Sequence, residues 1–113
     1  MRGDGTFEVV TERVLRDHPE DEPGRMLQSP GLRTDGRFYA FAPVDALVVK
    51  LPADRVTALV GAGRGEPCSP RPGRPMREWV RIPAPDEETA LSYVLEARAF
   101  VAGAGARRSR EVP

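Results

Sequence analysis

The spacing of apolar residues predicts three helices. In residues 7–17 apolar side chains recur at positions i, i+3 and i+7, Thr6 is placed to cap the N-terminus, and His18-Pro19 ends the segment. Pro52 opens a second helix, which Gly61 and Gly63 end. Asp86 caps a third helix, whose apolar stripe covers residues 90–101 and which ends at Gly103 and Gly105.

Alternation of apolar and polar residues predicts the strands between these helices. Residues 46–51 show it best: Leu47, Val49 and Leu51 share one face, while Val48 and Lys50 share the other. Asp35-Gly36 is a strong hairpin signal. Residues 37–42 follow it, with Phe38, Ala40 and Ala42 on one face and Tyr39 and Phe41 on the other.

Two further strands are predicted at the ends of this region. Residues 78–82 form the last strand, with Trp79 and Arg81 opposite Val80 and Ile82. We expect Trp79 to pack in the core under a helix. The first strand begins at residues 26–27, is interrupted at residues 29–31 and resumes at residues 32–34, because proline and glycine belong at a sheet edge or a bulge. Residues 20–24 are interpreted as a solvated acidic loop.

The resulting order of elements, α-β-β-β-α-β-α, predicts an α+β fold in which an antiparallel sheet packs against helices. The chain has 113 residues, which corresponds to one domain. We assign residues 1–5 to an N-terminal tail, residues 6–103 to the domain and residues 104–113 to a flexible arginine-containing tail.

Composition narrows the class of function. Seventeen basic residues balance seventeen acidic ones, and a net charge of zero disfavours a generic nucleic-acid binder. No apolar run approaches the roughly 18 residues of a membrane span, and the N-terminus lacks the apolar core of a secretory signal. A single cysteine excludes an intramolecular disulfide. We therefore expect a cytoplasmic protein without a membrane anchor.

Candidate catalytic residues are sparse. His18, the only histidine, lies at a helix end and is interpreted as a capping or solvated residue. Cys68 has no nearby histidine to serve as a base, so we interpret it as a small apolar residue. The acidic residues 20–22 lack the spacing of a calcium loop, and the glycines at 61–65 lack that of a phosphate loop. The sequence thus predicts no catalytic residue, no metal and no cofactor.

The most polar segment comprises residues 64–81, which carry five arginines and two glutamates around one tryptophan. Such a segment can contact a phosphate backbone or stack on bases, but the alternative, a core tryptophan with paired arginines, is favoured by the zero net charge. Candidate interaction residues here and on the preceding strand are Lys50, Arg71, Arg74, Arg77, Trp79 and Arg81.

Lys50 is the only lysine among seventeen basic residues. Chance survival of a lysine on a solvated face is one interpretation. A site that requires a compact ammonium rather than a planar guanidinium is the other. On the second interpretation Lys50 pairs with Glu66 or Glu78. Lys50→Arg and Lys50→Met should then both destabilise the fold or loosen the connection that residues 64–82 form.

Three stretches together resemble the N-terminal domain of the TfoX (Sxy) competence-regulator family. They are GRFYAF at residues 36–41, LVVKLPADRV at residues 47–56 and GRPMREWV at residues 73–80, the most specific of the three. MLQSPGL at residues 26–32 is similar to that family's first strand, with Leu27 where an aromatic residue is common. The likeness runs over about residues 7–101, and it extends more weakly to the YjbR-like family.

The resemblance implies a small bacterial α+β domain with a curved antiparallel sheet, a lysine at the VKLP position and no known catalytic residues. Longer members carry a separate C-terminal domain, which we do not expect here, so a role in competence is not implied. We expect a non-catalytic protein-interaction or regulatory module. Its partner is an unidentified protein or a second copy of the chain, and the alternative function is weak nucleic-acid binding through residues 64–81.

Overall fold

The computed structural model describes residues 5–26, 28–68 and 77–111, the last eight of them by their backbone alone. Its three helices are α1 (Thr6–Asp17), α2 (Ala53–Gly61) and α3 (Glu87–Glu111). Its strands are β1 (Glu22–Met26), β2 (Ser29–Thr34), β3 (Arg37–Phe41), β4 (Ala46–Lys50), β5 (Glu66–Pro67) and β6 (Trp79–Pro83).

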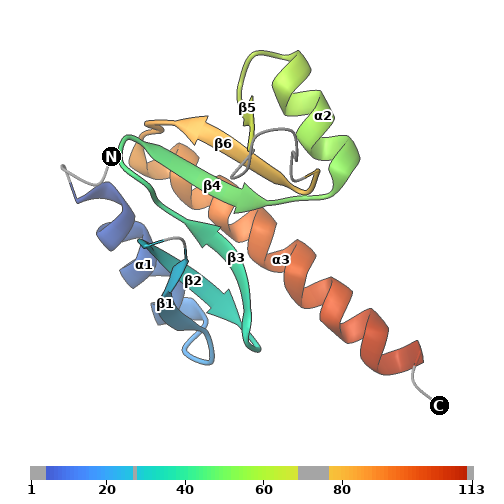
Figure 1. Cartoon of the computed structure of the whole chain (residues 1–113). Coiled ribbons are helices and arrows are strands. Elements are labelled where there is room, and N and C mark those ends of the chain that lie inside the picture. Colours follow the sequence, from blue (N-terminus) through green and yellow to red (C-terminus); the bar gives the residue numbers. More distant parts are fainter. Residues whose placement is uncertain (1–4, 27, 69–76, 112–113) are drawn as a thin grey trace.

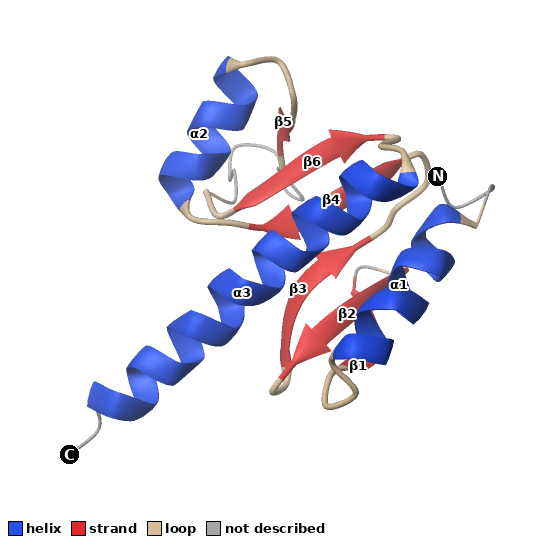
Figure 2. Cartoon of the chain, turned by 180° about the vertical axis from the view of Figure 1, so that it is seen from behind, coloured by secondary structure: helices blue, strands red, loops and turns tan. Residues whose placement is uncertain are grey.

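The six strands form one antiparallel sheet in the order β1-β2-β3-β4-β6-β5. Helices α1 and α3 lie side by side on one face of this sheet. Helix α2 lies next to β5 and β6, at the edge of the sheet opposite β1 (Figures 1 and 2). The predicted α+β class and the packing of the antiparallel sheet against helices are confirmed. None of the helices in the described part of the chain is both long enough and apolar enough to cross a bilayer.

The N-terminal edge of the sheet differs from the prediction. The expected acidic loop ends at Asp21, and β1 and β2 form a hairpin with Gln28 in its turn at φ 65°, rather than one interrupted strand. Leu27 lies outside the described residues. Gly31 allows β2 to lie close to β3, since a Cβ at this position would lie only 2.8 Å from the carbonyl oxygen of Ala40. Pro23 lies in the edge strand β1, where a missing backbone donor is tolerated.

A bulge in β3 changes which residues face the helices. The register passes from Leu32 opposite Ala40 to Arg33 opposite Phe38, so Tyr39 is an extra residue in the strand. Tyr39 and Ala40 therefore both belong to the main core, whereas Phe38 and Phe41 pack on the opposite face. The strict alternation predicted for this strand, with Tyr39 and Phe41 sharing a face, is wrong.

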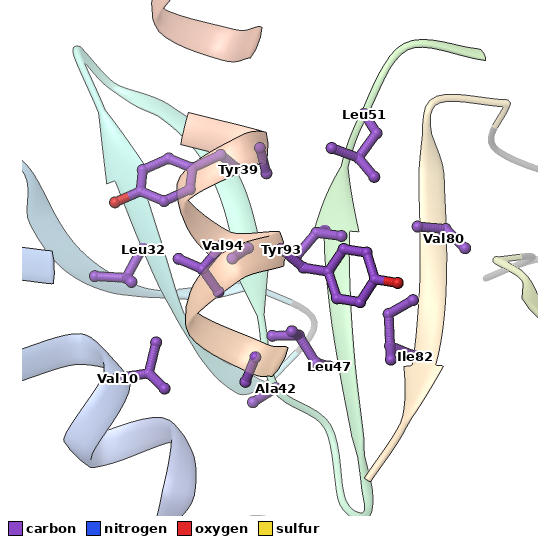
Figure 3. Packing of buried hydrophobic residues seen from close by; sticks show 14 of the residues in the cluster. Val10, Leu32, Tyr39, Ala42, Leu47, Leu51, Val80, Ile82, Tyr93 and Val94 are labelled. Carbon is purple, nitrogen blue, oxygen red and sulfur yellow. The ribbon is translucent and has the colours of Figure 1, made fainter. Parts of the chain in front are cut away.

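The main core lies between the sheet and the helices α1 and α3, with residues of α2 at one end. Leu47, Leu51, Val80 and Ile82 share this core with Tyr93 and Val94 of α3, and the ring of Tyr93 points toward Val80 and Ile82 (Figure 3). These strand residues are buried on the face that their alternation predicts. Val48 of β4 and Trp79 of β6 belong to a smaller apolar cluster on the opposite face, which confirms the two-sided pattern of both strands.

The helix ends follow the predictions in part. The Asp86 cap of α3 is confirmed, because its Oδ1 accepts a hydrogen bond of 2.8 Å from the backbone N–H of Thr89. Gly103 and Gly105 do not end α3, which continues to Glu111 and projects past the sheet (Figure 2). A glycine inside a helix costs only about 1 kcal/mol, and the alanines and arginines around these two favour the helix. The predicted tail at residues 104–113 thus begins inside the helix.

The two shorter helices begin one position away from the prediction. Gly5, with φ 76°, occupies the N-cap of α1, so Thr6 is the first helical residue and not the cap. Pro52 is likewise the N-cap of α2 rather than its first residue. Helix α2 includes Gly61, and Gly63 follows at φ 73°, a conformation that favours glycine.

Candidate functional site

A pocket of about 500 Å³ lies between α2 and the start of β6. We call it the Trp79 pocket. Within the described part of the chain, it is lined by Ala53, Asp54, Val56, Thr57, Val60, Pro67, Arg77 and Trp79. The α2 residues in this lining are spaced so that they share one side of the helix, since residues three or four positions apart are neighbours on a helix surface. That side of α2 forms a wall of the pocket. Its volume falls in the range of pockets that hold a small ligand or a large side chain.

The Trp79 pocket continues into a second hollow, which shares Ala53, Arg77 and Trp79 with it. The remaining residues of this hollow are Lys50 and Glu78. We call it the cationic end. Lys50 is the last residue of β4 and is opposite Trp79 in the register of β4 and β6. The structure therefore brings together three of the predicted interaction residues, Lys50, Arg77 and Trp79.

Trp79 is only 8% exposed, which confirms the prediction that it is buried. Its ring lies 5.5 Å from the ring of Phe41, with the planes tilted by 58°. The rest of its cluster is Val48 with the partly buried Met26, Phe38 and Cys68. Neither α1 nor α3 covers this face, since both pack on the other one; α2 lines the pocket beside Trp79, and the remaining neighbours of Trp79 come mainly from strands.

The Lys50 ammonium lies 5.9 Å from the centre of the Trp79 ring, a distance at which a cation is attracted to the ring face. The predicted ion pair of Lys50 with Glu66 or Glu78 does not occur among the described residues. Glu66 is instead paired with Arg81, whose Nη1 donates to Glu66 Oε1 at 2.7 Å. The two residues face each other in the register of β5 and β6, which explains the preference.

Arg81 therefore belongs to a strand pair and does not line the Trp79 pocket. The segment between α2 and β6 contains β5, which makes Arg81 a structural partner of Glu66. Arg71 and Arg74 lie outside the described residues. Of the arginines proposed for interaction, Arg77 is the one that the structure places at the pocket.

Cys68 and His18 occupy structural positions. Burial raises the pKa of the Cys68 thiol, and the nearby Arg81 opposes this shift only in part, so the reactive thiolate is disfavoured. His18 follows α1, and its backbone N–H donates to the carbonyl of Val14 at 2.8 Å. Its Nδ1 lies 3.8 Å from Glu20 Oε2. The described residues contain no group of three or more side chains that could hold a metal ion.

A buried polar cluster centred on Asp21 was missed in the sequence. Asp21 is 5% exposed, although the sequence placed it in a solvated loop. Its carboxylate accepts hydrogen bonds from Arg98 Nε at 2.6 Å, Arg98 Nη2 at 3.1 Å and Tyr39 Oη at 2.8 Å. Arg98 Nη2 also donates to Glu20 Oε2 at 2.8 Å. The signal in the sequence was Arg98, a charged residue within the apolar stripe of the third helix, because a charge at such a position needs a carboxylate partner.

The environment of Asp21 favours its charged form. Burial acts to raise its pKa, but hydrogen bonds from Arg98, Thr34 and Tyr39 outweigh burial, and the pKa lies below its usual range. Burial and the Asp21 charge raise the pKa of Tyr39 well above its usual value. Tyr39 thus stays a neutral donor, and the cluster joins α3 to the turn before β1 and to β3.

The two features differ in what they offer a ligand. The Asp21 cluster is buried and its donors are used within the chain. The Trp79 pocket is at the surface and combines aliphatic side chains with cations at one end. We therefore take the pocket as the candidate binding site. Comparisons of the chain with known protein families, with curated proteins and with solved structures found no match.

Proposed function

We propose that this chain is a non-catalytic protein-interaction or regulatory module, similar to the N-terminal domain of the TfoX family, which acts in the cytoplasm. Its partner docks at the Trp79 pocket. The observation that carries this proposal is the pocket itself, whose wall of Val56, Thr57 and Val60 faces a buried tryptophan. Aliphatic walls around an aromatic floor are typical of the places where a partner inserts an anchoring side chain.

Two contacts support a protein partner over the alternative, a nucleic acid. Stacking on a base requires a free aromatic face, and the Trp79 ring is packed against Phe41 in a largely buried position. Binding of phosphates requires unpaired cations, and the pairing of Arg81 with Glu66 leaves Lys50 and Arg77 as the candidate cations among the described residues. Of the described residues that could bind a nucleic acid, Trp79 and Arg81 are therefore already engaged within the chain.

The test is a selection of short random peptides on the immobilised full-length chain, followed by titration of the enriched peptides in solution. Trp79 is the only tryptophan in the sequence, so its fluorescence reports directly on the pocket. We expect enriched peptides to change the emission of Trp79. They should also shift backbone amide resonances of α2 and β6 in NMR spectra.

A matched pair of variants on α2 locates the binding. Thr57 lines the pocket and is exposed, so Thr57→Arg fills the pocket without removing a core side chain. Ala58 is the next residue, is also exposed and does not line the pocket. The proposal requires that Thr57→Arg abolish peptide binding and that Ala58→Arg leave it unchanged. Equal effects of the two variants, or selection of no peptide, contradict it.

The same titration with single- and double-stranded oligonucleotides tests the alternative. We expect any binding to disappear at physiological salt, because few phosphates can be neutralised. Submicromolar binding at that salt, weakened when Arg71, Arg74 and Arg77 are changed to Glu, would replace the proposal with a nucleic-acid function.

A further inference from the structure

The two ends of the site have different chemistry. Val56 and Val60 of α2 and Pro67 of β5 give the Trp79 pocket apolar side chains, and Thr57 and the carboxylate of Asp54 line it as well. The cationic end holds Lys50 and Arg77 beside Trp79. A ligand that fills both ends must therefore carry an apolar group and, next to it, a group that suits these cations.

Charge at the cationic end is unbalanced. Lys50 and Arg77 line it together with one carboxylate, that of Glu78. Neither cation forms an ion pair among the residues that the structure describes, in contrast to Arg13, Arg55, Arg81 and Arg98. One further carboxylate would neutralise this end of the site.

The position of the Lys50 ammonium is also defined before any ligand binds. It lies 5.9 Å from the Trp79 ring, whose own place is fixed by packing on Phe41. A cation held over an aromatic ring is pre-positioned, so a ligand anion loses less free energy in ordering it. The same tryptophan forms part of the apolar pocket, which places the two subsites side by side.

We propose that the site binds an acidic peptide segment of a partner protein, in which one large apolar side chain enters the Trp79 pocket and a neighbouring aspartate or glutamate binds Lys50 and Arg77. This inference rests on the proposed function and adds the chemistry of the partner. The juxtaposition of an aliphatic pocket with an excess positive charge carries it.

The peptides selected on the full-length chain test this inference by their composition. We expect an apolar residue next to an acidic one to be enriched. In synthetic peptides, Asp→Asn or Glu→Gln at that acidic position should weaken binding about tenfold, the effect of losing one charge-assisted contact of about 1.4 kcal/mol. Replacement of the apolar residue by alanine should weaken binding at least as much.

Variants of the chain then show which side chain receives the carboxylate. Arg77 is exposed, so Arg77→Gln keeps the fold, which a melting curve verifies. Against this variant the acidic and amide peptides should bind with nearly equal affinity. Arg64→Gln is the control, because Arg64 is exposed on the nearby loop and does not line the site; it should leave the tenfold difference intact.

Each outcome decides between the two proposals. Enriched peptides that bind at the pocket without an acidic preference overturn this inference and leave the proposed function standing. An acidic preference that survives both Arg77→Gln and Lys50→Gln places the carboxylate elsewhere and also overturns it. Selection of no peptide at all removes the proposed function and this inference with it.

Discussion

Arg98 and Asp21 form a two-point ion pair, with Arg98 Nε 2.6 Å from Asp21 Oδ2 and Arg98 Nη2 3.1 Å from Asp21 Oδ1. The Asp21 side chain is fully buried, and that of Arg98 is 14% exposed. The pair joins the middle of α3 to the turn before β1. Tyr39, the extra residue of the β3 bulge, completes the carboxylate's shell. One buried charge thus connects three parts of the chain that are remote in sequence.

We predict that Asp21→Asn lowers the free energy of unfolding by about 3–5 kcal/mol, the usual cost of breaking a buried ion pair by removing one partner. The reason is that the Arg98 guanidinium keeps its buried position, loses its buried anionic partner and retains only the exposed carboxylate of Glu20. Urea denaturation measures the change. Glu22→Gln is the control, because Glu22 is exposed and lies 3.7 Å from Arg33; it should change stability by less than about 1 kcal/mol.

The pH dependence of stability follows from the same residue. The pKa of Asp21 is lower in the folded chain than in the unfolded one, so its stabilising effect is present above the unfolded pKa of about 3.9. This effect is lost as the pH falls through the folded pKa. We expect the difference in melting temperature between the parent and Asp21→Asn to be largest near neutral pH and to shrink below about pH 4. A difference that is constant down to pH 2 would contradict this.

Trp79→Ala should cost about 3–5 kcal/mol, the range for emptying a large buried site. The ring fills the smaller apolar cluster with Phe41 and Val48, and its removal leaves a cavity that the surrounding strands close only in part. Chemical denaturation monitored by circular dichroism gives the value, since the variant lacks the fluorophore. Trp79→Phe keeps most of the packing and should cost clearly less. A parent-like melting temperature for Trp79→Ala would mean that the ring is not part of the folded core.

Lys50 variants distinguish the observed contact from the ion pair that the sequence predicted. Because Lys50 contacts the Trp79 ring, Lys50→Arg keeps a cation there and should leave stability nearly unchanged. Lys50→Met removes the cation and should cost about 0.5–1 kcal/mol. Paired melting curves measure both. Equal losses in the two variants would restore the requirement for a compact ammonium with a carboxylate partner.

Gly31→Ala should destabilise the fold by about 1–3 kcal/mol, since an added Cβ would lie 2.8 Å from the Ala40 carbonyl oxygen and 3.1 Å from Phe41 Cβ. The backbone of β2 would have to move away from β3 to relieve the overlap. Gly61→Ala is the matched control: it lies in α2 with no atom within 4 Å of a new Cβ and should stabilise the helix by up to about 1 kcal/mol. Melting temperatures that move in the same direction would contradict this account.

Features that depend on neighbours along the chain could be predicted from the sequence alone. Alternation in residues 46–51 predicted which side chains of β4 enter the main core. The turn at Asp35-Gly36 was predicted from residues that accept positive φ, and their φ values are 51° and 77°. The Asp86 cap is likewise local, because its oxygen and the N–H that it accepts are three residues apart.

Features that depend on partners far along the chain arise when the helices and strands pack together. The bulge at Tyr39 exists in the pairing of β3 with β2, and no pattern within β3 encodes it. Asp21 is buried because Tyr39 and Arg98 supply its hydrogen bonds from positions 18 and 77 residues away. The Trp79 pocket likewise needs α2 beside β6. Local spacing fixes the direction of a side chain along its own element, whereas burial and binding geometry depend on which elements meet.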